Sequence, residues 1–524
     1  MSSSSFNPLE PRSSIHDKKE EVSLVEHVGS EKQETSEDDR VSVADFGGDS
    51  TLPPPPILTP VQEKALYHKV DMRVMPMLTI MYLFSFLDRG NIGNAKIQGL
   101  TTQLDLTGNR YNIALTMYFI PYCLFECPSN LVLKKFRPSR WLPLITVTWG
   151  VIMTLMGLVK NYPQLVGVRV CLGVAEAGLF PGVVYYFTLW YPRDMLQFRV
   201  GIFYGAASMA GAFSGLLAFG ISFMDGIAGL EGWSWIFILE GIATVIVGVT
   251  AFFVLVDFPA TALFLTPEER SYLVWKKKFD NSSVGEEERF HIRHLLSTFT
   301  DWQIYAHILV YMSIVGPLYG FSLFLPSIIN TFGFSPAISN LLTVPPYIVA
   351  TIVLITFAIL SDRMKIRSLF ILICLVLLVV GFSINISDAP SGVKYFGAFL
   401  CTTGTYAAFP GIVAWLGNNL SGQYKRGVGM AVHIGVGNLS GAIASNVYRT
   451  QDAPRYILGH GIMLMFVGIG LIMTPLVVLN YIRINRHRDT SVAAGNLTYT
   501  DKQLREMGDR APDFSYCTVY DRVE

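Results

Sequence analysis

Apolar stretches long enough to cross a membrane recur along this chain from residue 74 onward. A transmembrane helix needs about 20 mostly apolar residues. Twelve stretches meet this requirement, and they cover residues 74–95, 112–133, 142–160, 165–190, 200–222, 234–257, 304–330, 338–360, 368–387, 393–417, 427–447 and 457–482. The pattern predicts an all-α membrane protein with twelve transmembrane helices.

One long polar interruption divides these spans into two groups of six. It runs from "DFPATALFLTPEERS" to "HLLSTFTDW", between the sixth and seventh spans. We therefore expect two six-helix halves, residues 61–257 and 304–486, joined by a connector at 258–303. A Ser-rich, charged tail at 1–60 has the composition of a disordered segment, and a second polar tail follows at 487–524.

The positive charges of the short loops predict the orientation. Basic residues gather after span 2 ("LKKFRPSR"), after span 8 ("SDRMKIRS") and after span 12 ("RINRHR"). Because Lys and Arg favour cytoplasmic loops, both termini and the connector are expected in the cytoplasm. The loops after spans 2 and 8 occupy equivalent places in the two halves, as in an internally duplicated transporter. Within them, Arg137, Asp362 and Arg363 are candidate gating or structural residues.

Composition narrows the class of protein further. Apolar residues make up 51% of the chain and charged residues 15%, with a net charge of zero. A neutral chain gives no electrostatic reason to expect a nucleic-acid partner. The six cysteines form no CxxC pair, so neither a metal site nor a disulfide framework is expected. No nucleotide-binding motif or other cofactor motif is visible, which favours an ion gradient as the energy source.

Two adjacent charges lie inside the first span, in "FLDRGNIGNA". If this helix enters from the cytoplasm near residue 74, Asp88 lies about 21 Å into a core of about 30 Å. Charges at such depth are costly and usually functional. Neighbouring helical residues point about 100° apart, so Asp88 and Arg89 each need a partner on another helix.

The fourth span offers such partners. Arg169 and Glu176 are two helical turns apart and share one face. They are expected about 6 Å and about 17 Å below the outer surface, at depths that bracket Asp88 and Arg89. If spans 1 and 4 face each other, the four charges can converge, and an arginine can hold an anion while an acid takes a proton. The alternative is a network that only locks the two helices together.

Five segments carry a more specific resemblance. "YLFSFLDRGNIGNAKIQGL" (82–100), "LFECPSNLVLKKFRPSRWLP" (124–143), "RVCLGVAEAGLFPGVVYYFTLWYPR" (169–193), "GWSWIFILEGI" (232–242) and "LTVPPYIVATIVLITFAILSDRMKIRS" (342–368) resemble the anion:cation symporter family of the major facilitator superfamily. The terminal "GDRAPDFSY" (508–516) fits its fungal allantoate permease branch. The resemblance implies the major facilitator fold. It also implies a proton site at Asp88, a substrate-binding and coupling role for Arg169 and Glu176, and a switching partner in Arg89.

Weaker candidates lie elsewhere in the spans. The second half offers hydroxyls, amides and aromatic rings that could clamp a small acid, namely Tyr319, Ser322, Tyr347, Tyr406 and Asn438. Each of these residues, taken alone, more often serves packing. Glu126 and Glu240 are expected in gating or structural pairs, because each lies near one end of its span.

These patterns together predict a monomeric, multi-pass secondary transporter, expected in the plasma membrane and without a metal or cofactor. It would import a small organic anion, such as nicotinate or another vitamin-like monocarboxylate, together with protons. Two alternatives remain open at this point: an exporter of an acidic metabolite with the same fold, and a nutrient-sensing transceptor. A membrane-embedded enzyme is not favoured, because no nucleophile–base pair lies at membrane depth.

Overall fold

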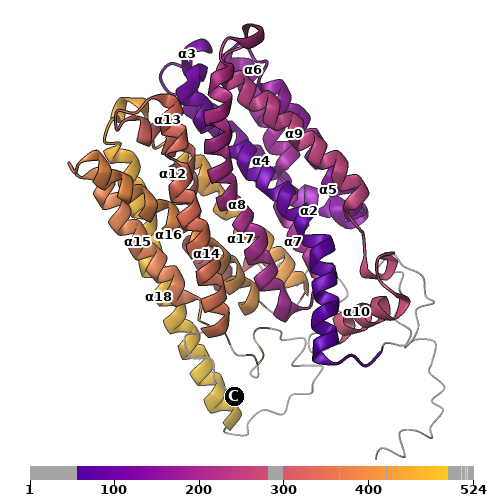
Figure 1. The fold of residues 1–524 in the computed structure, drawn as a ribbon. Coiled ribbons are helices and arrows are strands. Elements are labelled where there is room, and N and C mark those ends of the chain that lie inside the picture. Colours follow the sequence, from indigo (N-terminus) through magenta and orange to yellow (C-terminus); the bar gives the residue numbers. More distant parts are fainter. Residues whose placement is uncertain are drawn as a thin grey trace, which may run out of the picture. The chain divides into compact units, whose positions relative to one another are not determined.

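The protein is a bundle of long helices that run side by side (Figure 1). The structure is a computed structural model that describes residues 56–280, 299–364, 366–420 and 423–493, together with residues 509, 511, 514 and 516. The described residues form helices and turns. Residues 1–55, which include most of the predicted N-terminal tail, and residues 281–298 of the predicted connector lie outside this description.

Every predicted span falls on helical segments. The first group is α2 (Pro60–Ala95), α4 (Arg110–Lys135), α5 (Pro138–Met156), α6 (Tyr162–Glu176), α7 (Leu179–Trp190), α8 (Arg193–Ile221) and α9 (Gly232–Val254). The second group is α12 (Trp302–Asn330), α13 (Pro336–Leu341), α14 (Val344–Met364), α15 (Ser368–Ile386), α16 (Ser391–Asn419), α17 (Gln423–Ala444) and α18 (Ile457–Ala493). Among the described residues, nine helical segments are long and apolar enough to cross a membrane.

Local sequence explains where key helices begin and break. Thr59 caps α2 by accepting from the backbone N–H of Gln62, whose side chain bonds back to Thr59, and Pro60 occupies the first turn. The predicted fourth span is split into α6 and α7. Pro181 has no backbone N–H, so it cannot donate to the carbonyl of the residue four positions earlier. That residue lies at the break, just beyond Glu176. The break therefore places Glu176 at a helix end.

The outer faces of the bundle are apolar. Large side chains such as Ile246 and Phe253 on α9, Ile352 on α14 and Leu479 on α18 are exposed. In water such a surface would favour aggregation, whereas lipid tails solvate it well. Aromatic and aliphatic side chains fill the interior. These surfaces are those of an integral, multi-pass membrane protein.

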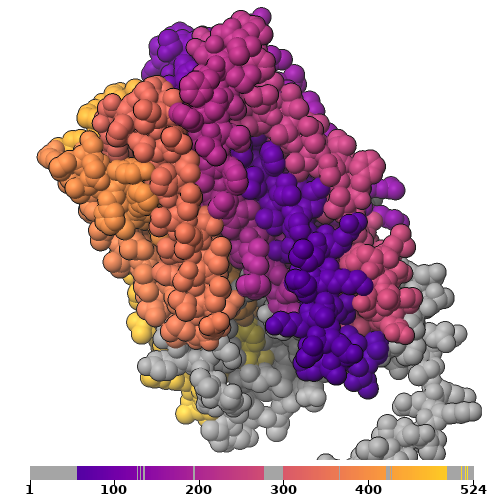
Figure 2. All heavy atoms as spheres, in the orientation of Figure 1, coloured from indigo at the N-terminus to yellow at the C-terminus, as the bar shows by residue number. Residues whose placement is uncertain are grey.

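The two groups of helices meet along a seam in which α8 packs on α14, α4 on α17 and α2 on α12. Figure 2 shows the meeting of α8 and α14 as a boundary between magenta and orange atoms. Helices α2 and α12 approach each other closely at Gly93. A Cβ placed on Gly93 would lie 2.5 Å from the carbonyl oxygen of Leu323, so only glycine permits this backbone contact. One turn earlier, a Cβ on Gly90 would meet nothing closer than 3.9 Å.

Part of the connector is folded. Helix α10 (Pro267–Asp280) lies beside the start of α2 (Figure 1). Lys69 pairs with Glu269 at 2.7 Å and Lys276 pairs with Glu63 at 3.2 Å. Such exposed pairs contribute only a few tenths of a kcal/mol each, about 0.2–1. They set the position of α10 more than they stabilise the fold.

Part of the predicted C-terminal polar tail packs against the helix bundle. Tyr516 is buried, stacks on Tyr481 with ring centroids 4.6 Å apart, and accepts a hydrogen bond from Gln303 at 2.7 Å. Arg488 donates to the carbonyl oxygens of Phe514 and Asp509. We call the described residues Asp509, Ala511, Phe514 and Tyr516 the tail cap. Composition alone missed it, because the partners lie on α12 and α18.

Lys425 of α17 joins the tail cap to the helix bundle. Its ammonium group contacts the Asp509 carboxylate at 2.7 Å and also pairs with Asp301, the N-cap of α12. All three side chains are largely buried, so the cation and the two carboxylates need one another. The start of α12, the start of α17 and the C-terminal segment are thus held at one point.

Candidate functional site

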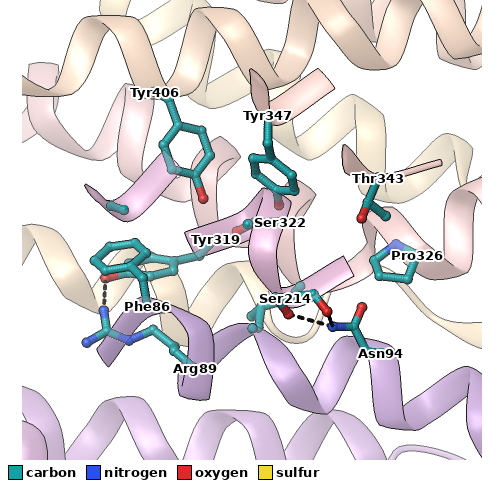
Figure 3. Close-up of a pocket in the computed structure, with 14 residues that line it drawn as sticks. Phe86, Arg89, Asn94, Ser214, Tyr319, Ser322, Pro326, Thr343, Tyr347 and Tyr406 are labelled. Carbon is teal, nitrogen blue, oxygen red and sulfur yellow. Dashed lines mark hydrogen bonds between the residues drawn. The ribbon is translucent and has the colours of Figure 1, made fainter. Parts of the chain in front are cut away.

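A cavity lies between the two groups of helices and receives residues from both. The residues that line it are Phe86, Arg89, Gly90 and Asn94 of α2, Ala207, Gly211 and Ser214 of α8, Tyr319, Ser322, Leu323 and Pro326 of α12, Thr343 and Tyr347 at the start of α14, and Tyr406 of α16. Figure 3 shows Tyr347 and Tyr406 on the side opposite Arg89 and Asn94. In this arrangement the volume of the cavity is only about 30 Å³.

Arg89 is the charged residue of that lining. Its Nη1 donates to the hydroxyl of Tyr319 on α12 at 2.7 Å, and its Nη2 donates to Glu176 at 2.6 Å (Figure 3 shows the first bond). The guanidinium carbon also lies 5.0–5.7 Å from the ring centroids of Phe86, Tyr118, Tyr122 and Tyr319. Aromatic faces stabilise a cation at such distances. Arg89 therefore connects the first group of helices to the second.

Glu176 holds Arg89 from the side away from α12. Its Oε1 accepts from Arg89 and from the hydroxyl of Ser85 at 2.5 Å, and its Oε2 accepts from Tyr118 at 2.6 Å. Glu176 is buried, with a residue exposure of 1%. Three donors, one of which is the Arg89 cation, satisfy it, so the buried pair is well compensated in this arrangement.

Arg169 lies close by but does not line the cavity. It is buried, and its guanidinium carbon lies 5.5 Å from the ring centroid of Tyr118. Among the described residues, its Nε and Nη1 have no hydrogen-bond partner. Of the four charges expected to converge, Arg89 and Glu176 pair with each other, and Arg169 lies against the ring of Tyr118, as Arg89 does.

Asp88 points away from this group. Its Oδ2 accepts from the indole N–H of Trp149 at 3.0 Å and from the hydroxyl of Thr244 at 2.8 Å. It makes no ion pair within the described part of the chain, and its Oδ1 has no hydrogen-bond partner there. The prediction that Asp88 shares a cluster with the two arginines is therefore corrected. Adjacent residues of one helix face different neighbours, and Asp88 faces α5 and α9.

The aromatic and hydroxyl candidates of the second half divide into two sets. Tyr319, Ser322, Tyr347 and Tyr406 line the cavity, and the rings of Tyr347 and Tyr406 meet edge to face at 5.5 Å. Asn438 does not line it and instead accepts a hydrogen bond from Tyr311 at 3.3 Å.

Glu126 lies at the seam between α4 and α17. It is fully buried, and a Cβ placed on Gly435 of α17 would lie 3.7 Å from its Oε2. Neither of its carboxylate oxygens makes a hydrogen bond of ordinary geometry within the described residues. Its nearness to the basic loop predicted a salt bridge, but Glu126 makes none within the described residues.

The remaining gating and structural candidates have simpler surroundings. Arg137 is exposed at the N-terminus of α5, and Arg363 is exposed in the last turn of α14. Asp362 contacts Arg367 at 3.8 Å. Glu240 is buried against α2, where it accepts a hydrogen bond from Asn91.

Asn94 and Ser214 are polar cavity residues that the sequence analysis did not single out. Asn94 donates to the hydroxyl of Ser214 at 2.6 Å, and this hydroxyl donates to Asn91 at 3.0 Å. The signal for Asn91 and Asn94 was visible, since "RGNIGN" spaces polar residues by three along a membrane helix. Ser214 had no such signal within the glycine-rich "GAFSG".

Similarity to known proteins identifies the family. Residues 78–445 match the Major Facilitator Superfamily. This match covers well over half of the chain. The chain belongs to the Major Facilitator Superfamily.

Its relatives are fungal members of this superfamily. The chain is 34% identical to an uncharacterized transporter of Schizosaccharomyces pombe, over 91% of this chain and 95% of the relative. It is 32% identical to the MFS-type transporter cnsO of Penicillium expansum, over 88% and 92% of the two chains. It is also 32% identical to the major facilitator-type transporter hxnP of Emericella nidulans, over 87% and 93%.

Solved structures share the fold of this major facilitator protein. A bacterial homolog of the human lysosomal transporter Spinster, inward-facing and occupied, aligns with a TM-score of 0.57 and 14% identity, over 81% of this chain and 97% of that one. A D-xylose-proton symporter aligns with a TM-score of 0.57 and 13% identity, over 76% and 96%. At these identities the likeness concerns the fold.

Proposed function

We propose that this protein is a secondary transporter that imports a small organic monocarboxylate together with protons by alternating access. In this proposal twelve helices cross the plasma membrane in two halves of six, and both termini are cytoplasmic. The observation that supports this proposal is the position of Arg89, which lines the cavity and forms an ion pair with Glu176. An arginine placed in this way can exchange one carboxylate partner for another.

The exchange suggests how an anion would bind. A carboxylate that enters the cavity meets the Arg89 face that now donates to Tyr319, and a guanidinium can hold a carboxylate through two parallel hydrogen bonds. Turning toward the substrate would weaken the contact between Arg89 and Glu176. Glu176 would then be a buried carboxylate without its cation, which is costly.

Protonation of Glu176 would remove the cost of leaving its carboxylate without a cation. Losing a neighbouring positive charge favours the protonated form of an acid, so Glu176 would take up a proton as the anion binds. Anion and proton together add no net charge to the low-dielectric interior, whereas either one alone does. Release on the other side reverses both steps, because the return of Arg89 expels the proton from Glu176. Arg169 would keep the local potential positive for the arriving anion.

The cavity wall favours a flat or compact acid. Phe86, Tyr319, Tyr347 and Tyr406 present aromatic rings, and Ser322 adds a hydroxyl. Aromatic walls with few polar groups suit a ring-bearing monocarboxylate such as nicotinate. The cavity is now too narrow for such a ring, so entry requires that the two halves of the seam separate on one side.

The relatives support the transporter class. Several are transporters by their printed names, and the solved D-xylose-proton symporter shares the fold. The nearer assignment, to the anion:cation symporters and their allantoate permease branch, rests on the sequence resemblance. The substrate and the direction remain part of this proposal.

Uptake measurements test the proposal. Cells that lack their own acid carriers and express this chain should accumulate labelled nicotinate, or another monocarboxylate of a test panel, faster at acidic than at neutral external pH. A protonophore should suppress accumulation, and nicotinamide should compete poorly because it carries no charge for Arg89. If expression instead lowers the cellular content of an acid and uptake ignores the proton gradient, the exporter function replaces this one.

A further inference from the structure

A second pair of acids lies inside the first half, on the side of α2 that faces away from the cavity. Asp88 contacts Thr244 of α9, and Asn91, one turn later on α2, contacts Glu240, one turn earlier on α9. The two acids are therefore neighbours across one helix interface. Both are buried, with residue exposures of 1% and 3%.

Each acid uses one oxygen and leaves the other without a partner. Asp88 accepts at Oδ2 from Trp149 and Thr244, and Glu240 accepts at Oε2 from Asn91. Within the described residues, Oδ1 of Asp88 and Oε1 of Glu240 make no hydrogen bond. An unpaired oxygen on a buried carboxylate is expensive, whereas on a protonated acid it is the atom that carries the hydrogen.

No cation compensates this pair among the described groups of the helices packed against α9. These elements are α2, α5, α8 and the short helices η3 (Lys96–Leu100) and η4 (Ser222–Met224). Lys96 of η3 has its ammonium over the rings of Tyr111 and Phe324. Arg89 of α2 pairs with Glu176 and donates to Tyr319. Arg140 lies in the first turn of α5, and Arg199 of α8 pairs with Asp71. The helix α9 itself is preceded by Glu231 at its N-cap.

A chain of hydrogen bonds joins the pair to the cavity. Asn94 and Ser214 both line the cavity; Asn94 donates to Ser214, Ser214 to Asn91, and Asn91 to Glu240. Amide groups do not relay protons readily, so this chain transmits position and not protons. A substrate that draws Asn94 or Ser214 toward itself would loosen the donor that Asn91 provides to Glu240.

We propose that Glu240 is a further proton-binding acid beside Asp88, and that it senses cavity occupancy through Asn94, Ser214 and Asn91. Removing a donor from a carboxylate favours its protonated form, so occupancy of the cavity and protonation of the pair support each other. The proton comes from water on the side where substrate enters and returns to water on the other side. The coupling role deepens the proposed proton-coupled transport and rests on it. The protonation itself does not, because it follows from the burial and contacts of the two acids.

Infrared spectroscopy tests the protonation without any substrate. The purified protein at neutral pH should show carbonyl absorption from protonated carboxylic acids, and Glu240→Gln should remove part of it. The amide of Gln keeps an oxygen that can accept from Asn91, so the variant should fold. The matched control is Glu231→Gln, the same substitution at the N-cap of the same helix. An unchanged carboxylic-acid absorption in Glu240→Gln overturns the inference.

Transport tests the coupling. In proteoliposomes with labelled nicotinate, Glu240→Gln should lower the number of protons moved per nicotinate and flatten the pH profile of uptake, while Glu231→Gln retains both. A Glu240→Gln protein with the wild-type ratio and pH profile removes Glu240 from coupling. If the wild-type protein itself moves no protons with nicotinate, the proposed function fails and the infrared result still decides whether the pair is protonated.

Discussion

Arg89 joins the two groups of helices at the cavity. It bonds Glu176 on α6 and Tyr319 on α12 at the same time, from two different nitrogens. A lysine has one nitrogen on a flexible stem, so it cannot keep this forked geometry. The family resemblance had assigned substrate binding to Arg169, but the lining of the cavity favours Arg89 as the anchor of the anion.

Comparison of two matched variants tests that assignment. Arg89→Lys should raise the apparent KM for the transported acid by about 10–100-fold, because one charge-assisted hydrogen bond contributes about 1.5–3 kcal/mol. Arg169→Lys should raise it by less than about 5-fold, since a residue outside the lining acts only through its charge at a distance. Uptake kinetics, normalised to the amount of protein in the membrane, measure both. The reverse order would return the anchor to Arg169.

At the scale of helices, the contact between α2 and α12 sets how far the cavity can close. Gly93 lets the backbone of α2 touch the carbonyl of Leu323, next to Ser322 in the cavity wall. Backbone atoms cannot turn aside as a side chain can. Any larger residue at 93 must therefore push the two helices apart.

Gly93→Ala should consequently disfavour the closed arrangement. We expect a fall in transport rate of about 10-fold or more, in line with a penalty of about 1–3 kcal/mol for overpacking. Gly468→Ala on α18 is the control, because its added methyl group meets no atom within 4 Å, the residue lies outside the cavity lining, and alanine favours the helix. Reaction of a Ser322→Cys side chain with a water-soluble thiol reagent should also increase in the Gly93→Ala background. Equal rates in the two alanine variants would show that the α2–α12 contact does not limit transport.

Considered as a whole molecule, the fold was largely predictable and the partnerships were not. Apolar length placed the helices, since a bilayer demands continuous apolar surface of a set extent, and "DR" within such a stretch announced Asp88 and Arg89 as special. The direction in which each of them points depends on helix rotation, which a run of apolar residues on all sides leaves undetermined. Asp88 consequently accepts hydrogen bonds from Trp149 and Thr244 and does not pair with an arginine.

The tail cap gives a prediction for the whole molecule. Tyr516→Ala removes a ring that stacks on Tyr481 and a hydroxyl that accepts from Gln303 and donates to the carbonyl of Asp509. We expect a loss of about 2–4 kcal/mol in stability, typical of a buried aromatic residue, seen as a lower thermal unfolding temperature in detergent. Tyr516→Phe keeps the stacking and should lose only about 1 kcal/mol. If both variants unfold at the wild-type temperature, the tail cap does not stabilise the bundle.

The tail cap also has a consequence for how the chain is made. Lys425 and Arg488 obtain Asp509 and the backbone around Phe514 as partners only after nearly all of the chain has left the ribosome. Chains are synthesised at about 5–20 residues per second, and earlier parts fold before later ones. A product that stops just after α18 would leave Lys425 with Asp301 as its acidic partner and would uncover the ring of Tyr481, on which Tyr516 stacks. The contacts of Lys425 and Arg488 with the tail cap must therefore form after the helices that carry these two residues have been synthesised.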